Sequence, residues 1–166
     1  MSVVTVRVTK DKIEMASDSI IVKGWSKIPN PQNKFAKMQK INNTIVGGVG
    51  DAEESSLLFH FMKTHILDNV DESAIIDYFI EFKRWKNDLC GNNLVNNTYI
   101  IASKGKAYYV ERMFITEIND YYAIGAGEDY ANGALYMGAS VVDAVKASCE
   151  LCAMVCEPII YESIER

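Results

Sequence analysis

The sequence predicts an α+β fold: a four-layer αββα sandwich of two antiparallel sheets flanked by helix pairs. Segments with strand character are grouped together and separated from segments with helix character, which favours antiparallel sheets over alternating βαβ units. The order is sheet, two helices, sheet, two helices and a final strand. Two sheets that each bury a face, with two helix pairs to cover them, give four layers. Without internal repeats or a visible boundary, residues 1–166 are predicted to form one domain.

The first fifty residues carry the alternation of apolar and polar side chains that is typical of strands. In the opening stretch MSVVTVRV, the side chains of Val4, Val6 and Val8 are expected on one face of a strand. The dipeptides Lys10-Asp11 and Asn42-Asn43 are suited to tight turns between strands. The expected strands cover residues 2–9, 12–19, 34–41 and 44–49, with residues 20–27 as a strand or a loop before the break at PNPQN.

The hydrophobic period changes to that of a helix after residue 50. Asp51 is a good N-cap for a helix over residues 51–68, since Glu53 and Glu54 then stand in its first turn. A second helix over residues 72–89 is ended by Gly91. The later elements are predicted as strands over residues 98–103, 106–112 and 121–124, helices over 130–138 and 141–155, and a last strand over 158–164.

Composition and charge narrow the classes of partner. The net charge of −5 argues against nucleic acid and against an anionic membrane surface. No apolar run reaches the ~18 residues that a membrane span needs, and the N-terminus lacks the layout of a signal peptide, so a cytoplasmic protein is expected.

The four cysteines do not have the spacing of a metal site. Cys149, Cys152 and Cys156 follow one another at steps of three and four, and no second ligand pair lies nearby in the sequence. These steps are those of one helix face, on which reduced cysteines pack as small apolar residues. Neither a metal nor a cofactor is expected.

Three residues near the N-terminus stand at equal intervals. Sixteen residues separate Ser2 from Asp18, and sixteen more separate Asp18 from Lys34. Each of these residues has an ordinary explanation when taken alone, such as a turn cap or a solvated strand residue. Shortly after them, the sequence GGVG includes Gly48, where the backbone could approach a ligand closely.

Together these residues could supply the parts of a hydrolytic site. If Met1 is removed, Ser2 carries both a hydroxyl and the free α-amine, whose ordinary pKa of about 7.7–8.0 suits a general base. A nearby Lys34 ammonium would favour the neutral amine by charge repulsion, and Asp18 would hold that lysine in place. The backbone N–H of Gly48 could stabilise the oxyanion that forms on a substrate carbonyl.

At these positions the chain resembles the proteasome β-type subunits of the N-terminal nucleophile (Ntn) hydrolase superfamily, and in layout the HslV peptidase in particular. That family begins its mature chain with Thr or Ser, followed by Asp and Lys at the same intervals and by a glycine at the position of Gly48. The segments NKFAKMQKINNTIVGGVGDAEE and YYAIGAGEDYANGA are similar to two further family motifs. The likeness extends over nearly the whole chain.

The resemblance implies the Ntn hydrolase fold and a threonine-peptidase-like mechanism with Ser2 as the nucleophile. It further implies a self-compartmentalising homo-oligomeric ring that takes peptides or unfolded proteins, and it leaves room for an ATP-dependent unfoldase as partner. Only Met1 would have to be removed to expose Ser2.

Two positions depart from the family pattern. The chain has Ala126 where the family usually has a serine beside the active site, and Ala153 where an aspartate is usual. Ser17 or Ser19 could replace part of that proton network. Two alternatives therefore stay open: a catalytically silent structural or binding homologue, and an amidase that acts on small molecules.

Overall fold

The computed structural model describes residues 2–24, 26–28 and 36–166 of the chain. The strands are β1 (Val4–Val8), β2 (Lys12–Ser17), β3 (Ile21–Lys23), β4 (Ser26–Ile28), β5 (Met38–Ile41), β6 (Thr44–Val49), β7 (Thr98–Ser103), β8 (Lys106–Glu111), β9 (Phe114–Ile118), β10 (Tyr121–Ile124) and β11 (Ile160–Glu165). The helices are α1 (Ala52–Thr64), α2 (Glu72–Cys90), α3 (Glu128–Tyr136) and α4 (Val141–Leu151).

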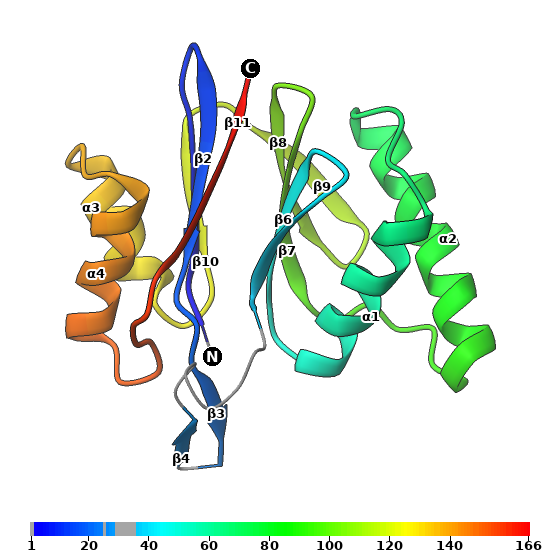
Figure 1. The fold of residues 1–166 in the computed structure, drawn as a ribbon, viewed down its shortest axis with the longest axis horizontal. Coiled ribbons are helices and arrows are strands. Elements are labelled where there is room, and N and C mark those ends of the chain that lie inside the picture. Colours follow the sequence, from blue (N-terminus) through cyan, green and yellow to red (C-terminus); the bar gives the residue numbers. More distant parts are fainter. Residues whose placement is uncertain (1, 25, 29–35) are drawn as a thin grey trace.

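The strands form two antiparallel sheets that face each other. One sheet has the order β10-β1-β2-β11 and the other the order β5-β6-β7-β8-β9, while β3 and β4 make a separate hairpin. Figure 1 shows α3 and α4 on the outside of the first sheet and α1 and α2 on the outside of the second. The predicted four-layer αββα sandwich is therefore confirmed.

Three apolar clusters fill the spaces between the four layers. Val4, Val6 and Val8 belong to the cluster between the two sheets, whereas Val3 belongs to the cluster beneath α3 and α4. The predicted alternation of β1 is thus confirmed, because neighbouring valines enter different layers. The third cluster, between the second sheet and helices α1 and α2, is rich in aromatic rings, including those of Phe61, Phe79, Phe82 and Tyr99.

Local sequence signals account for most element boundaries. The side chain of Asp51 accepts hydrogen bonds from the N–H groups of Glu53 and Glu54, as expected of an N-cap. Helix α2 ends at Gly91, whose positive φ of 69° is that of a C-terminal cap. Asn42 and Asn43 both have positive φ, which suits the tight β5–β6 turn.

The structure differs from the sequence prediction at several places. Helix α1 ends at Thr64 rather than near residue 68, because His65 is already extended, and α3 begins at Glu128, two residues earlier than predicted. Strand β9 was not predicted; it follows a turn in which Arg112 takes a positive φ of 57°, where glycine or asparagine is the usual signal. Helix α4 ends at Leu151 rather than near residue 155, because Cys152 is already extended. Of the three spaced cysteines, only Cys149 therefore lies within the helix.

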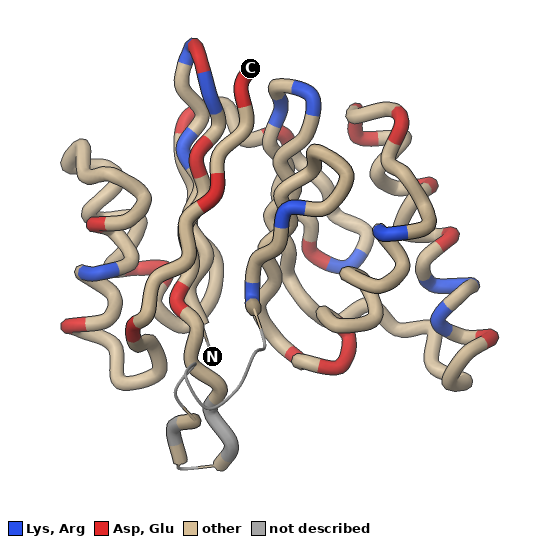
Figure 2. The backbone as a smooth tube through the Cα atoms, viewed as in Figure 1, with Lys and Arg blue, Asp and Glu red and all other residues tan. Residues whose placement is uncertain are grey.

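The surface carries charges of both signs. Figure 2 shows basic residues interspersed with acidic ones, as at the end of the sandwich where the β1–β2 and β7–β8 turns lie. Within the described ranges, no helix has the length and apolar character that crossing a membrane requires.

Candidate active site

Ser2 lies just ahead of β1 and is buried, with 4% of its surface exposed. Its carbonyl oxygen accepts a hydrogen bond from the N–H of Gly127, 3.2 Å away, in the turn between β10 and α3. That turn approaches so closely that a Cβ on Gly125 would lie 2.4 Å from the same oxygen. Glycine is needed at position 125 for this reason, and also because its φ is +102°.

Asp18 directly follows β2, and its hydrogen bonds with Val3 extend the pairing of β1 and β2 to the residue next to Ser2. The N–H of Val3 donates to Asp18 Oδ1 at 2.9 Å, and the N–H of Asp18 donates to the carbonyl of Val3 at 3.3 Å. The Asp18 side chain is thereby fixed against the peptide that follows Ser2.

The second oxygen of Asp18 forms a buried ion pair with Lys37. Lys37 Nζ lies 2.6 Å from Asp18 Oδ2, and the two side chains are 5% and 0% exposed. Burial raises the pKa of Asp18, against the opposing effects of the Lys37 ammonium and the Val3 amide. Burial likewise lowers the pKa of Lys37, against the attraction of Asp18.

Lys34, the lysine expected from the sequence to pair with Asp18, lies outside the described residues. The described partner of Asp18 is Lys37, three positions further along the chain. Sequence reasoning missed Lys37 because it relied on equal intervals. The signal that could have identified Lys37 is its position directly before β5. The pairing of β5 with β6 places Lys37 opposite Gly48.

The first two glycines of GGVG are required by packing. A Cβ on Gly47 would lie 2.6 Å from Val4 Cγ1, across the space between the sheets, and one on Gly48 would lie 2.7 Å from the ring of Tyr99. The N–H of Gly48 donates to the carbonyl of Lys37 at 2.9 Å. The sequence had suggested this N–H as the oxyanion donor, but here strand pairing uses it, and Gly48 instead fixes the backbone of Lys37.

The end of β6 reaches the neighbourhood of Ser2. A Cβ on Gly125 would lie 3.0 Å from Val49 Cγ1 as well as close to the Ser2 carbonyl, so Val49 and the Gly125 turn meet there. On a strand, the N–H groups of residues two apart point to the same side. The N–H of Gly50 therefore points to the side of the Gly48 N–H, and it has no hydrogen-bond partner among the described residues.

On the other side of Ser2, the helix pair α3–α4 contributes small polar groups. Ser148 Oγ donates to the carbonyl of Gly127 at 2.9 Å, and Cys152 Sγ lies 3.4 Å from the carbonyl oxygen of Ala126. Ala126 and Ala153 are both exposed. The side chain that reaches the Ala126 turn is thus Cys152 rather than Ala153, which the sequence had placed near the nucleophile.

Cys149 lies close enough to Asp18 for the two groups to interact electrostatically. Burial and the Asp18 carboxylate together raise the pKa of the Cys149 thiol to about 12, so this thiol is neutral near pH 7. Within the described part of the chain, no group of three His, Cys, Asp or Glu side chains could hold a metal ion.

Comparison with known proteins identifies the fold. No protein-family model matches the sequence, and no curated protein sequence does. Among solved structures, BPH of Thiobacillus denitrificans in complex with epoxomicin has a TM-score of 0.87 at 20% identity, with 98% of each chain covered. Eukaryotic HslV of Trypanosoma brucei has a TM-score of 0.70 at 14% identity, with 99% of each chain covered.

A third solved structure is Anbu, described as an ancestral beta-subunit, from Yersinia bercovieri. Its TM-score is 0.74 at 12% identity, and 99% of this chain and 81% of that chain are covered. These likenesses cover 98–99% of the present chain. The chain therefore has the HslV-like fold of the proteasome β-type Ntn hydrolases.

Proposed function

We propose that the protein is an N-terminal serine hydrolase that cleaves amide bonds through an acyl-enzyme on Ser2. The observation that carries the proposal is the position of the Lys37–Asp18 pair. Asp18 binds the Lys37 ammonium with one oxygen and the Val3 N–H with the other. A buried positive charge is thereby held two hydrogen bonds from the peptide that follows Ser2, where it would favour the neutral form of a freed α-amine.

The reaction begins once hydrolysis of the Met1–Ser2 bond has freed the α-amine. Ser2 Oγ forms a bond to the substrate carbonyl carbon as its proton passes to the α-amine. The carbon–nitrogen bond of the substrate then breaks, and the leaving amine takes up that proton. Water hydrolyses the resulting ester, which restores the Ser2 hydroxyl and releases a carboxylic acid.

In this proposal the oxyanion donor is the N–H of Gly50. The Gly48 N–H is used by the carbonyl of Lys37, whereas the Gly50 N–H directly follows Val49, whose side chain meets the Gly125 turn. An amide held in a fixed turn stabilises a developing negative charge without reorganisation during the reaction.

We propose peptides or unfolded proteins as substrates, and a homo-oligomeric ring as the assembly. Tyr136 and Met137, at the end of α3, are 76% and 81% exposed, and Leu151, at the end of α4, is 63% exposed. Tyr136 and Met137 lie by the turn between α3 and α4, and Leu151 lies at the other end of α4. Exposed large apolar side chains on the outer helix layer support the proposal that this layer meets another subunit. Light scattering on the purified protein tests the ring, because a monomer would exclude it.

A second candidate is a homologue that keeps the fold without turnover. The observation that favours it is Ala126, which offers no hydroxyl to the proton network beside Ser2; the Cys152 thiol lies against the Ala126 carbonyl instead. A thiol is a weaker hydrogen-bonding group than a hydroxyl. This candidate predicts that Ser2 stays unreactive even after Met1 is removed.

Epoxomicin distinguishes the candidates, because an α′,β′-epoxyketone offers a ketone to the Ser2 hydroxyl and an adjacent epoxide to the α-amine. Intact mass first establishes whether Met1 is absent. We then expect one epoxomicin adduct on the protein and none on Ser2→Ala. Absence of an adduct on protein that begins at Ser2 would favour the silent homologue. An adduct without any cleavage of peptide libraries would point to a small-molecule amidase.

A further inference from the structure

We infer that Asn97 is a positioning residue that holds the Gly50–Asp51 turn at the reacting carbonyl, supported from behind by the buried Glu54–Lys86 pair. This inference rests on the proposed function. Asn97 touches neither Ser2 nor substrate in it, and acts through the backbone of the turn. The sequence predicted Glu54 only as an acidic residue in the first turn of a helix, and it gave Asn97 and Lys86 no role.

The Asn97 side chain binds both backbone groups of Asp51, and so holds the two peptide units that flank this residue. Its Oδ1 accepts a hydrogen bond from the N–H of Asp51 at 2.6 Å, and its Nδ2 donates to the carbonyl of Asp51 at 2.7 Å. The same Nδ2 donates to Ser55 Oγ at 2.9 Å. Asn97 is 1% exposed, so water does not compete for these bonds.

Contact between Asn97 and Gly50 explains the unusual backbone of the turn. A Cβ on Gly50 would lie 2.1 Å from Asn97 Oδ1, and the φ of Gly50 is +128°. Only glycine accommodates both conditions. Asn97 therefore holds the Gly50–Asp51 peptide, which directly follows the peptide that carries the Gly50 N–H.

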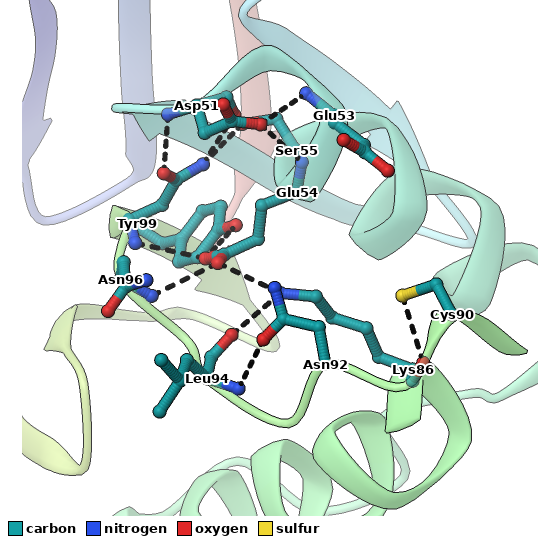
Figure 3. Close-up of polar contacts among 11 residues, drawn as sticks. Asp51, Glu53, Glu54, Ser55, Lys86, Cys90, Asn92, Leu94, Asn96 and Tyr99 are labelled. Atoms are coloured by element: carbon teal, nitrogen blue, oxygen red, sulfur yellow. Dashed lines mark hydrogen bonds and ion pairs between the residues drawn. The ribbon is translucent and has the colours of Figure 1, made fainter. Parts of the chain in front are cut away.

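Glu54 anchors Asn97 in turn. Glu54 Oε1 accepts hydrogen bonds from the N–H of Asn97 at 2.9 Å and from the hydroxyl of Tyr99 at 3.0 Å. Glu54 Oε2 accepts from the N–H of Asn96 at 3.0 Å and from Lys86 Nζ at 3.1 Å. Figure 3 shows these donors converging on Glu54 from α2, from β7 and from the segment before β7.

Lys86 completes the network from the neighbouring helix. Its Nζ also donates to the carbonyl of Leu94 at 2.6 Å, and the Lys86 and Glu54 side chains are 4% and 5% exposed. A buried ion pair adds little net stability but makes one geometry strongly preferred. Here the preferred geometry is that of the segment leading into β7, from which Asn97 reaches the turn.

The location of the turn gives this network a function beyond stability. The turn follows Val49, which meets the Gly125 turn beside Ser2, and in the proposed function it carries the oxyanion donor, the Gly50 N–H. A displacement of a donor by a fraction of an ångström weakens stabilisation of an oxyanion while binding of the rest of the substrate is unaffected.

The test uses the full protein, with Met1 removed, and epoxomicin as the probe. Adduct formation on Ser2 is followed by intact mass over a series of concentrations, which gives a limiting rate and a half-saturating concentration. For Asn97→Ala we expect a limiting rate lower by about tenfold or more, with a half-saturating concentration within about threefold of the parent's. Ser55→Ala, which removes only one partner of Asn97, should slow the reaction by about threefold. It serves as the second variant if Asn97→Ala does not fold.

Tyr78→Phe is the matched control. It removes a buried hydrogen bond of 2.7 Å, from Tyr78 to the carbonyl of His65, in the same helix layer but at the other end of α1. We expect it to lower Tm without changing the limiting rate. If the limiting rate of Asn97→Ala equalled that of the parent, or if Tyr78→Phe lowered the limiting rate as much, the inference would be overturned. The proposed function would stand in either case. Failure of the parent protein to form any adduct would overturn the proposed function, and the inference with it.

Discussion

Lys37 Nζ lies 2.6 Å from Asp18 Oδ2, and the other oxygen of Asp18 is bound by the Val3 N–H at 2.9 Å. One carboxylate thus connects a buried ammonium to the backbone beside Ser2. Because transferring both charges from water is costly, a pair of this kind contributes little net stability. Its effect is to fix a positive charge close to the start of the chain.

The Cys149 thiol near this pair should be chemically inert at neutral pH. With a pKa of about 12, only about one Cys149 in 10⁴ would be a thiolate at pH 8. Because the pKa is raised, the thiolate fraction increases about tenfold with each pH unit until the pH approaches 12. Alkylation with iodoacetamide and peptide mapping between pH 7 and 9 should modify the exposed Cys90 first. Equally fast alkylation of both cysteines at pH 7 would contradict the burial of Cys149.

Two glycines should respond in opposite directions to substitution by alanine. Gly133 lies within α3 with open space around its Cα, so Gly133→Ala should stabilise the protein by about 0.5–1 kcal/mol through the higher helix propensity of alanine. Gly125→Ala should destabilise it by more than about 2 kcal/mol, because a Cβ would overlap the Ser2 carbonyl and because φ is positive. Urea denaturation measures both changes, and equal effects would contradict the close approach at Ser2.

Local signals made most of the fold predictable from the sequence. The Asp51 cap and the Asn42-Asn43 turn were recognised because each carries its conformational preference in its own side chains. Strand β9 was missed because the turn before it places Arg112, rather than glycine or asparagine, at positive φ. Asparagine and glycine favour positive φ, so they mark a turn in the sequence. At Arg112 tertiary packing imposes the same geometry on a residue that gives no such signal.

The candidate site was predictable only in part, because its residues come together through long-range pairing. Ser2 and Asp18 stand on neighbouring strands joined by a short turn, so their proximity follows from the β1–β2 register. Lys37 precedes β5, which belongs to the other sheet, and it follows the β3–β4 hairpin. Because no hydrophobic periodicity predicts the length of that hairpin, the sequence did not show which lysine reaches Asp18. The contact between Asn97 and Glu54 could not be predicted, because Glu54 was recognised only as an acid in the first turn of a helix and because the contact depends on how α1 packs against β7.

Ser17 offers a test of a buried hydroxyl without a partner. Its Oγ is the only buried side-chain nitrogen or oxygen in the described residues that lacks a hydrogen bond. By contrast, the Ser19 hydroxyl is bound to the carbonyl of Pro158. Because an unpaired buried polar group costs free energy, Ser17→Ala should leave stability unchanged or raise it by about 1 kcal/mol, and Ser19→Ala should lower it by a similar amount. Thermal denaturation compares the two, and a large loss in Ser17→Ala would reveal an interaction of this hydroxyl.

The two lysines Lys34 and Lys37 are separable by substitution. Lys37→Met leaves the Asp18 carboxylate buried without its cation, which should cost about 3–5 kcal/mol and abolish the epoxomicin adduct on Ser2. The double variant Asp18→Asn/Lys37→Met removes both charges, and the new amide oxygen can still accept the Val3 N–H. We therefore expect stability within about 1 kcal/mol of the parent but still no adduct, since the charge that favours the neutral amine is gone.

Lys34→Met is the control for these variants and should retain both stability and adduct formation. Urea denaturation and intact mass after epoxomicin treatment are measured on all four proteins. An adduct that survives in the double variant would show that no ammonium at residue 37 tunes the Ser2 amine. Loss of the adduct in Lys34→Met, with Lys37→Met still reactive, would assign the role to Lys34. Because the double variant separates charge from stability, the tuning role of the Lys37–Asp18 pair is tested independently of its contribution to folding.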